Sequence, residues 1–270
     1  MAEIKKLLII GCGNMGGAML AGWLAEGVAP TRFEVLDPAL EAAPKGVTLH
    51  REAPVAPDHD AVLLGFKPQQ LDGIAPQLEM LTGDGVTIYS LLAGVELATL
   101  RQTFPTANAH VRVMPNLAAR IGKSPVILAQ AGLSDPQRDA TLAFFDLLGT
   151  ALWLDDETRF DLVTALAGSG PGFVYRFIDA LSGAAQDLGL APEMASKLAL
   201  SMVEGATSLA NDSDLSPGEL ADRVASPGGM TREGLNVLDE DNSLRSLLIR
   251  TLKATADKGV ELARSARKQS

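Results

Sequence analysis

Three glycines near the start of the chain have the spacing of a phosphate-binding turn. Gly11, Gly13 and Gly16 follow the apolar run 7–10 and accompany the start of a helix expected over residues 15–26. The first glycine permits a tight turn, the second leaves room for a pyrophosphate, and the third lets helix and strand pack closely. The unpaired N–H groups at a helix start attract phosphate charge. We therefore expect Gly11, Gly13, Asn14, Met15 and Gly16 to bind a dinucleotide; the alternative is a glycine-rich turn that binds nothing.

Asp37 stands at the end of the second expected strand, residues 33–36. It lies about 20 residues beyond the last glycine, the usual offset of an acid that binds the adenosine ribose hydroxyls. A 2′-phosphate there would meet a carboxylate, and the next arginine is Arg51, so the cofactor is expected to be NAD(P)H with a preference for NADH. The alternative role of Asp37 is to cap a short helix. Cys12, inside the turn, is interpreted as a small packing residue rather than a reactive thiol.

The elements that position these residues alternate between strand and helix at first and are helical later. Short apolar strands are expected at 7–10, 33–36, 60–66, 86–92, 110–114 and 125–129. Helices are expected at 160–166, 171–188, 192–211, 217–224, 230–238 and 244–267. This order predicts an α/β protein, with a Rossmann-type dinucleotide-binding domain over residues 1–157 and an all-helical domain over 158–270. Several of the later helices are apolar on more than one face, which predicts a homodimer or higher homo-oligomer through this domain.

Composition excludes several other classes of protein. The 270 residues include 33 acidic and 23 basic ones, a net charge of -10, which argues against nucleic-acid and anionic-membrane partners. One cysteine and three scattered histidines predict no metal site. The first apolar run is too short for a signal sequence or a membrane span, so the cytoplasm is the expected location.

Further turns follow the later strands. Phe66-Lys67-Pro68, Ala93-Gly94 and Asn116 each come just after an expected strand, where open α/β sheets bind ligands. Their alternative is ordinary turn chemistry between a strand and a helix, and for Asn116 a simple turn amide.

A second glycine-rich loop lies in the helical half. Ser226, Gly228, Gly229, Met230 and Thr231 precede or begin an expected helix. Exposed N–H groups and two hydroxyls in a small concavity suit a carboxylate, which predicts a substrate site. The alternative is a plain turn at a helix end.

The order of these motifs, together with Met-Pro-Asn at 114–116 and Gly-Ser-Gly-Pro at 168–171, resembles the pyrroline-5-carboxylate reductases over essentially the whole chain. The resemblance implies reduction of 1-pyrroline-5-carboxylate to L-proline by hydride transfer from NAD(P)H. It implies that the turns at 66–68 and 93–94 line the ribose and nicotinamide, and that the loop at 226–231 holds the substrate carboxylate. Ser226 and Thr231 are then the candidate catalytic residues. Asp214 aligns approximately with an acid that contacts the ring nitrogen, or is a solvated loop acid.

Some positions depart from the family pattern. Gly172 and Phe173 replace a small residue and a tyrosine, Met230 replaces a threonine or alanine, and Leu-Ala at 117–118 replaces Thr-Pro. These replacements affect the expected range of substrates more than the expected type of reaction. One rival is a β-hydroxyacid dehydrogenase, but the helix that would carry its catalytic lysine, residues 172–187, contains none. The other rivals are a different imine reductase and a non-catalytic dinucleotide-binding regulator.

Overall fold

The computed structural model describes residues 4–55 and 58–267, with side chains to residue 261. It divides into two compact units, which are described separately. The first reaches Ser169 and resumes at Thr255, and the second is Gly170–Ala254. The units change about a dozen residues later than the expected boundary at 157/158, because η5 (Glu157–Arg159), α5 (Phe160–Val163) and η6 (Thr164–Gly168) belong to the unit that contains the sheet.

The first unit is built on an eight-stranded sheet of order β3-β2-β1-β4-β5-β6-β7-β8. The strands are β1 (Leu7–Ile10), β2 (Phe33–Leu36), β3 (Thr48–His50), β4 (Ala61–Leu64), β5 (Thr87–Ser90), β6 (Ala109–Met114), β7 (Ser124–Ala131) and β8 (Gly149–Trp153). All neighbours pair in parallel except β6 and β7, which are antiparallel. The six expected strands are confirmed, with the expected ends for β1 and β2 and shifted ends for the other four, whereas β3 and β8 were not expected.

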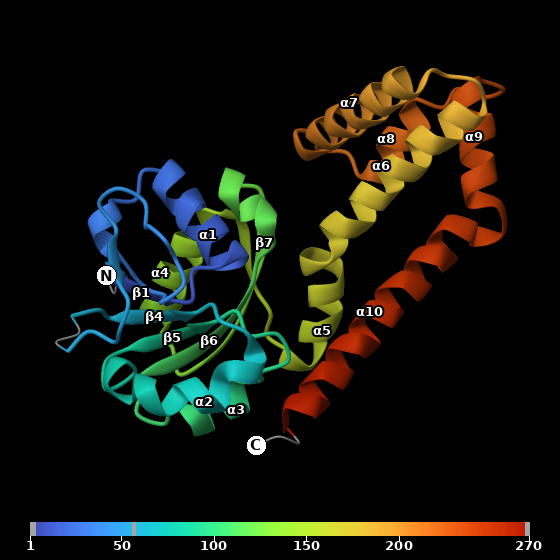
Figure 1. The fold of residues 1–270 in the computed structure, drawn as a ribbon. Helices are drawn as coiled ribbons and strands as arrows, with labels where there is room; N and C mark the ends of the chain where they lie inside the picture. The colour runs from blue at the N-terminus through green and yellow to red at the C-terminus, as the bar shows by residue number, and fades with distance from the viewer. Residues whose placement is uncertain (1–3, 56–57, 268–270) are drawn as a thin grey trace. The chain divides into compact units, whose positions relative to one another are not determined.

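Helices cover both faces of this sheet, as Figure 1 shows. α1 (Asn14–Ala25) and α4 (Asp135–Asp146) lie on one face, and α2 (Leu71–Ile74) and α3 (Leu97–Thr103) on the other. Short turns of 3₁₀ helix connect them: η1 (Pro30–Arg32), η2 (Pro68–Gln70), η3 (Ala75–Leu81) and η4 (Leu117–Ile121). The α/β expectation is therefore confirmed.

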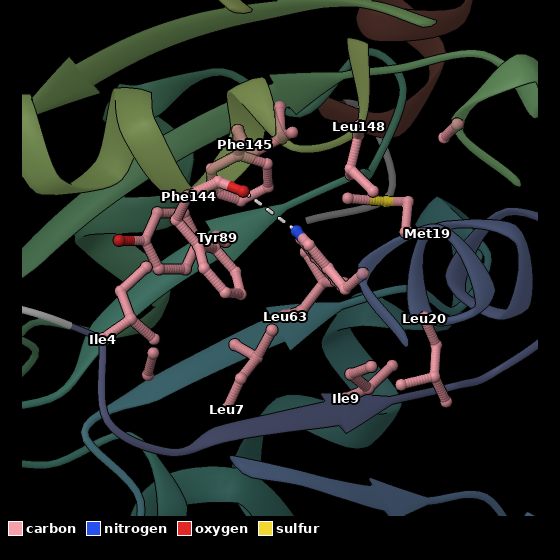
Figure 2. Close-up of a cluster of buried hydrophobic side chains, with 14 of the residues drawn as sticks. Ile4, Leu7, Ile9, Met19, Leu20, Leu63, Tyr89, Phe144, Phe145 and Leu148 are labelled. Carbon is pink, nitrogen blue, oxygen red and sulfur yellow. Dashed lines mark hydrogen bonds between the residues drawn. The ribbon is translucent and has the colours of Figure 1, made fainter. Parts of the chain in front are cut away.

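The larger core cluster fixes α1 and α4 against the strands (Figure 2). Leu7, Ile9 and Leu63 of the sheet are fully buried beneath Met19 of α1 and Phe145 of α4. Burying apolar side chains of this size stabilises the fold by roughly 1.5–3 kcal/mol each. The core thus holds the start of α1, and with it the glycine turn, at the end of β1.

The second unit is helical, as expected. It contains α6 (Gly170–Asp187), α7 (Pro192–Asn211), α8 (Pro217–Arg223), α9 (Met230–Asp239), η7 (Glu240–Asn242) and the first part of α10 (Ser243–Arg267). The Gly-Ser-Gly-Pro segment at 168–171 contains the end of η6 and the start of α6. The N–H of Ser169 donates to the carbonyl of Thr164 at 3.0 Å, so one π-helical turn continues the helix almost without a break.

Large apolar side chains of the second unit are exposed in the single chain. Phe177, Leu198 and Leu209 keep 50%, 56% and 63% of their surface exposed. Many large apolar side chains exposed on one unit are typical of an interaction surface. Among the described residues, no helix combines the length and apolar character needed to cross a membrane.

Candidate active site

The residues predicted to bind the cofactor lie along one edge of the sheet. β2, β1, β4, β5 and β6 are adjacent and parallel, so their carboxyl ends meet at that edge. Asp37 follows β2, the glycine turn follows β1, and the predicted turns at 66–68 and 93–94 follow β4 and β5. The strand order reverses between β1 and β4, and ligands of open α/β sheets bind at such a switch point.

Each of the three positions in the turn requires glycine for a different structural reason. Gly11 has φ of +83°, and a Cβ there would lie 2.8 Å from the backbone nitrogen of Phe66. A Cβ on Gly16 would lie 2.9 Å from the carbonyl oxygen of Gly11. Gly13, in contrast, has nothing within 4 Å of its would-be Cβ, and as N-cap of α1 it has no capping side chain. The space beside Gly13 and the free helix start fit a pyrophosphate.

The carboxylate of Asp37 is fixed by backbone N–H groups. One oxygen accepts from Cys12 and the other from Ala39, both at 2.9 Å. Cys12 itself is buried, and burial raises the pKa of its thiol to about 11, with the charge of Asp37 adding to the shift. The thiol is therefore protonated at neutral pH, which agrees with a packing role.

Arg51 is a functional candidate that the sequence did not reveal. Its guanidinium donates to the carbonyls of Pro38 at 3.0 Å and Glu41 at 2.9 Å, in the loop that begins with Asp37. Arg51 is 14 residues from Asp37 in the sequence but lies beside it in space. The sequence separation of the two residues, which we used as an argument for NADH, therefore does not support that preference. β3 pairs with β2 in parallel and brings the residue after its carboxyl end beside Asp37.

The turns after β4 and β5 have defined local structure. Lys67 is the N-cap of η2, where its N–H donates to the side-chain oxygen of Gln70 at 3.1 Å and Pro68 occupies the first turn. Gly94 has φ of +76° in a turn closed by a hydrogen bond from the N–H of Val95 to the carbonyl of Leu92. Both turns expose backbone at the cofactor edge.

Asn116 is buried, and its side chain forms hydrogen bonds to the backbone of the same chain. The oxygen accepts from the N–H of Ala118 at 2.9 Å, and the amide donates to the carbonyl of Ala167 at 2.9 Å. This geometry is that of the turn amide that the sequence left as the alternative. One amide hydrogen remains for a ligand, since a carboxamide has two.

The second glycine-rich loop forms a tight turn at the start of α9. The N–H of Gly229 donates to the carbonyl of Ser226 at 2.9 Å, so it is not among the free donors that we expected. A Cβ on Gly229 would lie 2.5 Å from the hydroxyl of Ser226, and Gly228 has φ of +71°. The donors left for a carboxylate are the first N–H groups of α9, at Met230 and Thr231.

An ion pair supports this loop. Arg232 contacts the carboxylate of Asp222 at 2.7 Å and the carbonyl of Ala225 at 3.4 Å, which joins α9 to α8 and to the residue before the loop. Asp214 is exposed in the turn between α7 and α8. Met230 and Thr231 are exposed as well, so a ligand could reach the helix start. Among the described residues, no group of three His, Cys, Asp or Glu side chains is arranged to hold a metal ion.

Models of two known protein families match this chain. A family model described as NADP oxidoreductase coenzyme F420-dependent matches residues 6–94, and one described as pyrroline-5-carboxylate reductase dimerisation matches residues 157–262. The chain is therefore an oxidoreductase with a dinucleotide-binding domain and a dimerisation domain.

Known relatives that match over nearly the whole chain are pyrroline-5-carboxylate reductases. Pyrroline-5-carboxylate reductase of Pseudomonas aeruginosa is 33% identical over 266 residues, covering 96% of this chain and 97% of the relative. Pyrroline-5-carboxylate reductase 2 of Bacillus subtilis is 33% identical over 276 residues, with coverage of 96% and 95%. This chain belongs to the pyrroline-5-carboxylate reductase family. The structure of a pyrroline-5-carboxylate reductase from Coxiella burnetii matches with a TM-score of 0.88 at 28% identity, covering 96% of this chain and 99% of that one.

Proposed function

We propose that this chain reduces 1-pyrroline-5-carboxylate to L-proline with NAD(P)H. The observation that carries the proposal is the open phosphate cradle beside Gly13, at the switch point of the sheet, in a member of this family. When bound, the reduced nicotinamide supplies the hydride that adds to the imine carbon. Purified protein should oxidise NADH or NADPH when the imine is added; no turnover with either cofactor would contradict the proposal.

The chain's own residues hold and orient the cofactor. The first turn of α1 with Gly13 receives the pyrophosphate, and Asp37 receives the ribose hydroxyls. Backbone at 66–68 and 93–94 lines the ribose and nicotinamide side. The remaining amide hydrogen of Asn116 is available to the carboxamide or the substrate. Orientation at one rigid sheet edge is the main contribution to rate that these residues make.

The loop at the start of α9 holds the substrate carboxylate. The N–H groups of Met230 and Thr231, with the hydroxyls of Ser226 and Thr231, form its donor set. Asp214 is the carboxylate that we assign to the imine nitrogen. A protonated imine is already electrophilic, so these residues bind and orient without a nucleophile.

Substitutions in this loop test the substrate site. Gly229→Val places atoms against the hydroxyl of Ser226, and Gly228→Val is strained because φ there is +71°. Both should raise KM for the imine by about tenfold or more, equivalent to about 1.4 kcal/mol. Gly234→Ala, inside α9 with nothing within 4 Å of its Cβ, is the matched control and should leave KM unchanged. Unchanged kinetics in both valine variants would contradict this site.

Asp37 and Arg51 together set the choice of cofactor. We expect NADH to be preferred, because a 2′-phosphate would meet the Asp37 carboxylate while the Arg51 guanidinium is held by backbone carbonyls. Asp37→Ser should move kcat/KM towards NADPH. Arg51→Gln should change kcat/KM for NADPH less than Asp37→Ser does, because the Arg51 guanidinium is already bound to the carbonyls of Pro38 and Glu41. A preference of the wild-type protein for NADPH would contradict this assignment.

The helical unit forms the homodimer. Its exposed apolar surface, including Phe177 and Leu198, is the surface that we assign to the interface. Phe177→Glu should shift the mass measured by light scattering to that of a monomer, because a charge would be buried without a partner. Leu152→Glu, at a half-exposed position on the edge strand β8 of the first unit, is the control. Dimers that persist in Phe177→Glu would contradict the interface.

A further inference from the structure

A cavity opens at the amino-terminal edge of the sheet, opposite to the edge with the glycine turn. It has a volume of about 670 Å³ and lies between the end of α3, the start of β6 and the end of β7. None of its lining residues belongs to the cofactor or substrate set. Its polar side chains are Arg101, Gln102, Asn108 and His110.

Arg101 supplies positive charge to the wall of this cavity. It is exposed in the last turn of α3, and no carboxylate among the described residues forms an ion pair with it. In a chain with a net charge of -10, acidic side chains could readily have paired with it. An unpaired guanidinium in a concave site is suited to an oxyanion, because its planar donors match two anion oxygens.

His110 supplies an acceptor. It is 5% exposed, and its Nε2 lies 2.9 Å from the carbonyl oxygen of Phe104, so Nε2 carries the hydrogen and Nδ1 the lone pair. Burial lowers the pKa of His110, and the charge of Arg101 adds to this effect. The imidazole is therefore neutral at physiological pH, and Nδ1 can accept a hydrogen bond.

We propose that this cavity binds an oxyanion of the hydrogen-phosphate type, either free or as a phosphate monoester. The charged oxygens accept from Arg101 and from the Asn108 amide, and a hydroxyl donates to Nδ1 of His110. In inorganic hydrogen phosphate this hydroxyl is on phosphorus; a monoester is a dianion near neutral pH, so there a hydroxyl of its organic part donates instead. The volume falls within the roughly 300–1,000 Å³ of small-ligand pockets and exceeds the size of one phosphate, so it also accommodates the organic part of a monoester.

The test follows the imidazole signals of His110 by NMR in the full-length protein without cofactor. His110→Gln assigns the signals. Addition of inorganic phosphate or glycerol 3-phosphate should shift them saturably, and the ligand that saturates at the lower concentration identifies the source. Arg101→Gln should weaken binding by about tenfold or more, the effect of losing a charge-assisted hydrogen bond. Arg120→Gln, an exposed arginine of η4 outside the cavity, should bind as the wild type does.

Sulfate is the control that distinguishes a site requiring a hydrogen on the anion from a site that binds any oxyanion. It has no hydrogen near neutral pH, so it should shift His110 at least about tenfold less effectively. An equal response to sulfate would overturn the assignment to hydrogen phosphate. No saturable shift with either phosphate, or an unchanged shift in Arg101→Gln, would overturn the site itself. Arg101→Gln should retain wild-type turnover and melting temperature, which shows that any lost binding is local.

Discussion

The backbone N–H of Cys12 donates to a carboxylate oxygen of Asp37 at 2.9 Å, which joins the glycine turn to the end of the neighbouring strand. The N–H of Ala39 binds the other oxygen at 2.9 Å. The carboxylate is thus oriented before a ribose arrives, and binding does not have to order it. The residue between the first two glycines therefore has two roles: its N–H orients Asp37, and its side chain fills the core.

Cys12 should be unreactive in the folded protein. Burial, and then the charge of Asp37, raise the pKa of its thiol from 9.0 to about 11, so the thiolate fraction at pH 8 falls about 100-fold. Labelling by a thiol reagent should be slower by at least this factor than in the denatured chain. Above pH 9 the unfolded thiol ionises while the folded one does not, so stability should fall between pH 9 and about 11. Cys12→Ala should remove that part of the pH dependence, and rapid labelling of native protein would contradict the assignment.

Two glycines near the cofactor edge should respond in opposite ways to alanine. Gly13→Ala meets no atom within 4 Å, so it should change the free energy of unfolding by less than about 1 kcal/mol. Its methyl group would occupy the phosphate space and raise KM for NADH about tenfold or more. A Cβ on Gly22 would lie 2.1 Å from the carbonyl oxygen of Ala119, so Gly22→Ala should cost about 1–3 kcal/mol. Melting curves and cofactor kinetics on the two variants measure both effects, and a large loss of stability in Gly13→Ala would be inconsistent with an open cradle.

Acid should destabilise the protein through Glu34. Burial tends to raise the pKa of this carboxyl, but hydrogen bonds from Lys6 at 2.6 Å and His50 at 3.0 Å outweigh it and hold the pKa below 4.5. The resulting stability is present above pH 4.5 and lost as the pH falls through the lowered pKa of the folded state. Glu34→Gln should flatten urea-measured stability in this range.

Lys6→Met should destabilise the protein at neutral pH through the same carboxylate, Glu34. It leaves the Glu34 carboxylate, which is 7% exposed, without one of its partners, at a cost of about 1–3 kcal/mol. Lys5→Met is the control, because Lys5 is exposed and no partner among the described residues contacts its ammonium group. Equal losses in the two variants would show that the Glu34 contact contributes nothing.

Much of the sheet could be predicted because its central strands are short apolar runs bounded by glycine or proline. β3 was missed because it has only three residues, none of them fully buried, and its main support is its pairing with β2. Missing β3 also hid Arg51, since only the parallel pairing of β3 with β2 places the residue after His50 beside Asp37. β8 is an edge strand with one fully buried residue, and its sequence begins with glycine and threonine rather than with an apolar run.

The site was predictable where one local segment determines the geometry. The glycine spacing and the offset of Asp37 are local signals, and the structure brings the two segments together at the same edge of the sheet. The bonds of Asn116 to Ala118 and Ala167 depend in part on a contact between residues 51 positions apart, which no local pattern encodes. The π-helical turn before Gly170 likewise depends on a single extra residue in a helix and has no composition signal.

Arg112 should couple cofactor binding to the stability of the sheet unit. It is 4% exposed in β6, lies 2.8 Å from a carboxylate oxygen of Glu157 and stacks 3.7 Å above the ring of Phe160. The same oxygen accepts from the N–H of Leu97 at 2.8 Å, so it fixes the start of α3 just after the turn at 93–94. Arg112→Lys keeps the charge but loses the planar stack and the aligned donors.

We therefore expect Arg112→Lys to lower the free energy of unfolding by about 1–3 kcal/mol, because the hydrogen bond from the buried Arg112 to the Glu157 carboxylate and the cation–π contact are weakened together. KM for NADH should rise while KM for the imine changes less, because the disturbed turn faces the cofactor edge. Arg159→Lys is the matched control: its ion pair with Asp156 at 3.3 Å is exposed, and such pairs contribute about 0–1 kcal/mol. Wild-type stability and NADH kinetics in Arg112→Lys would show that the Glu157 contact does not position the turn, and a loss in Arg159→Lys as large as that in Arg112→Lys would attribute the effect to charge alone.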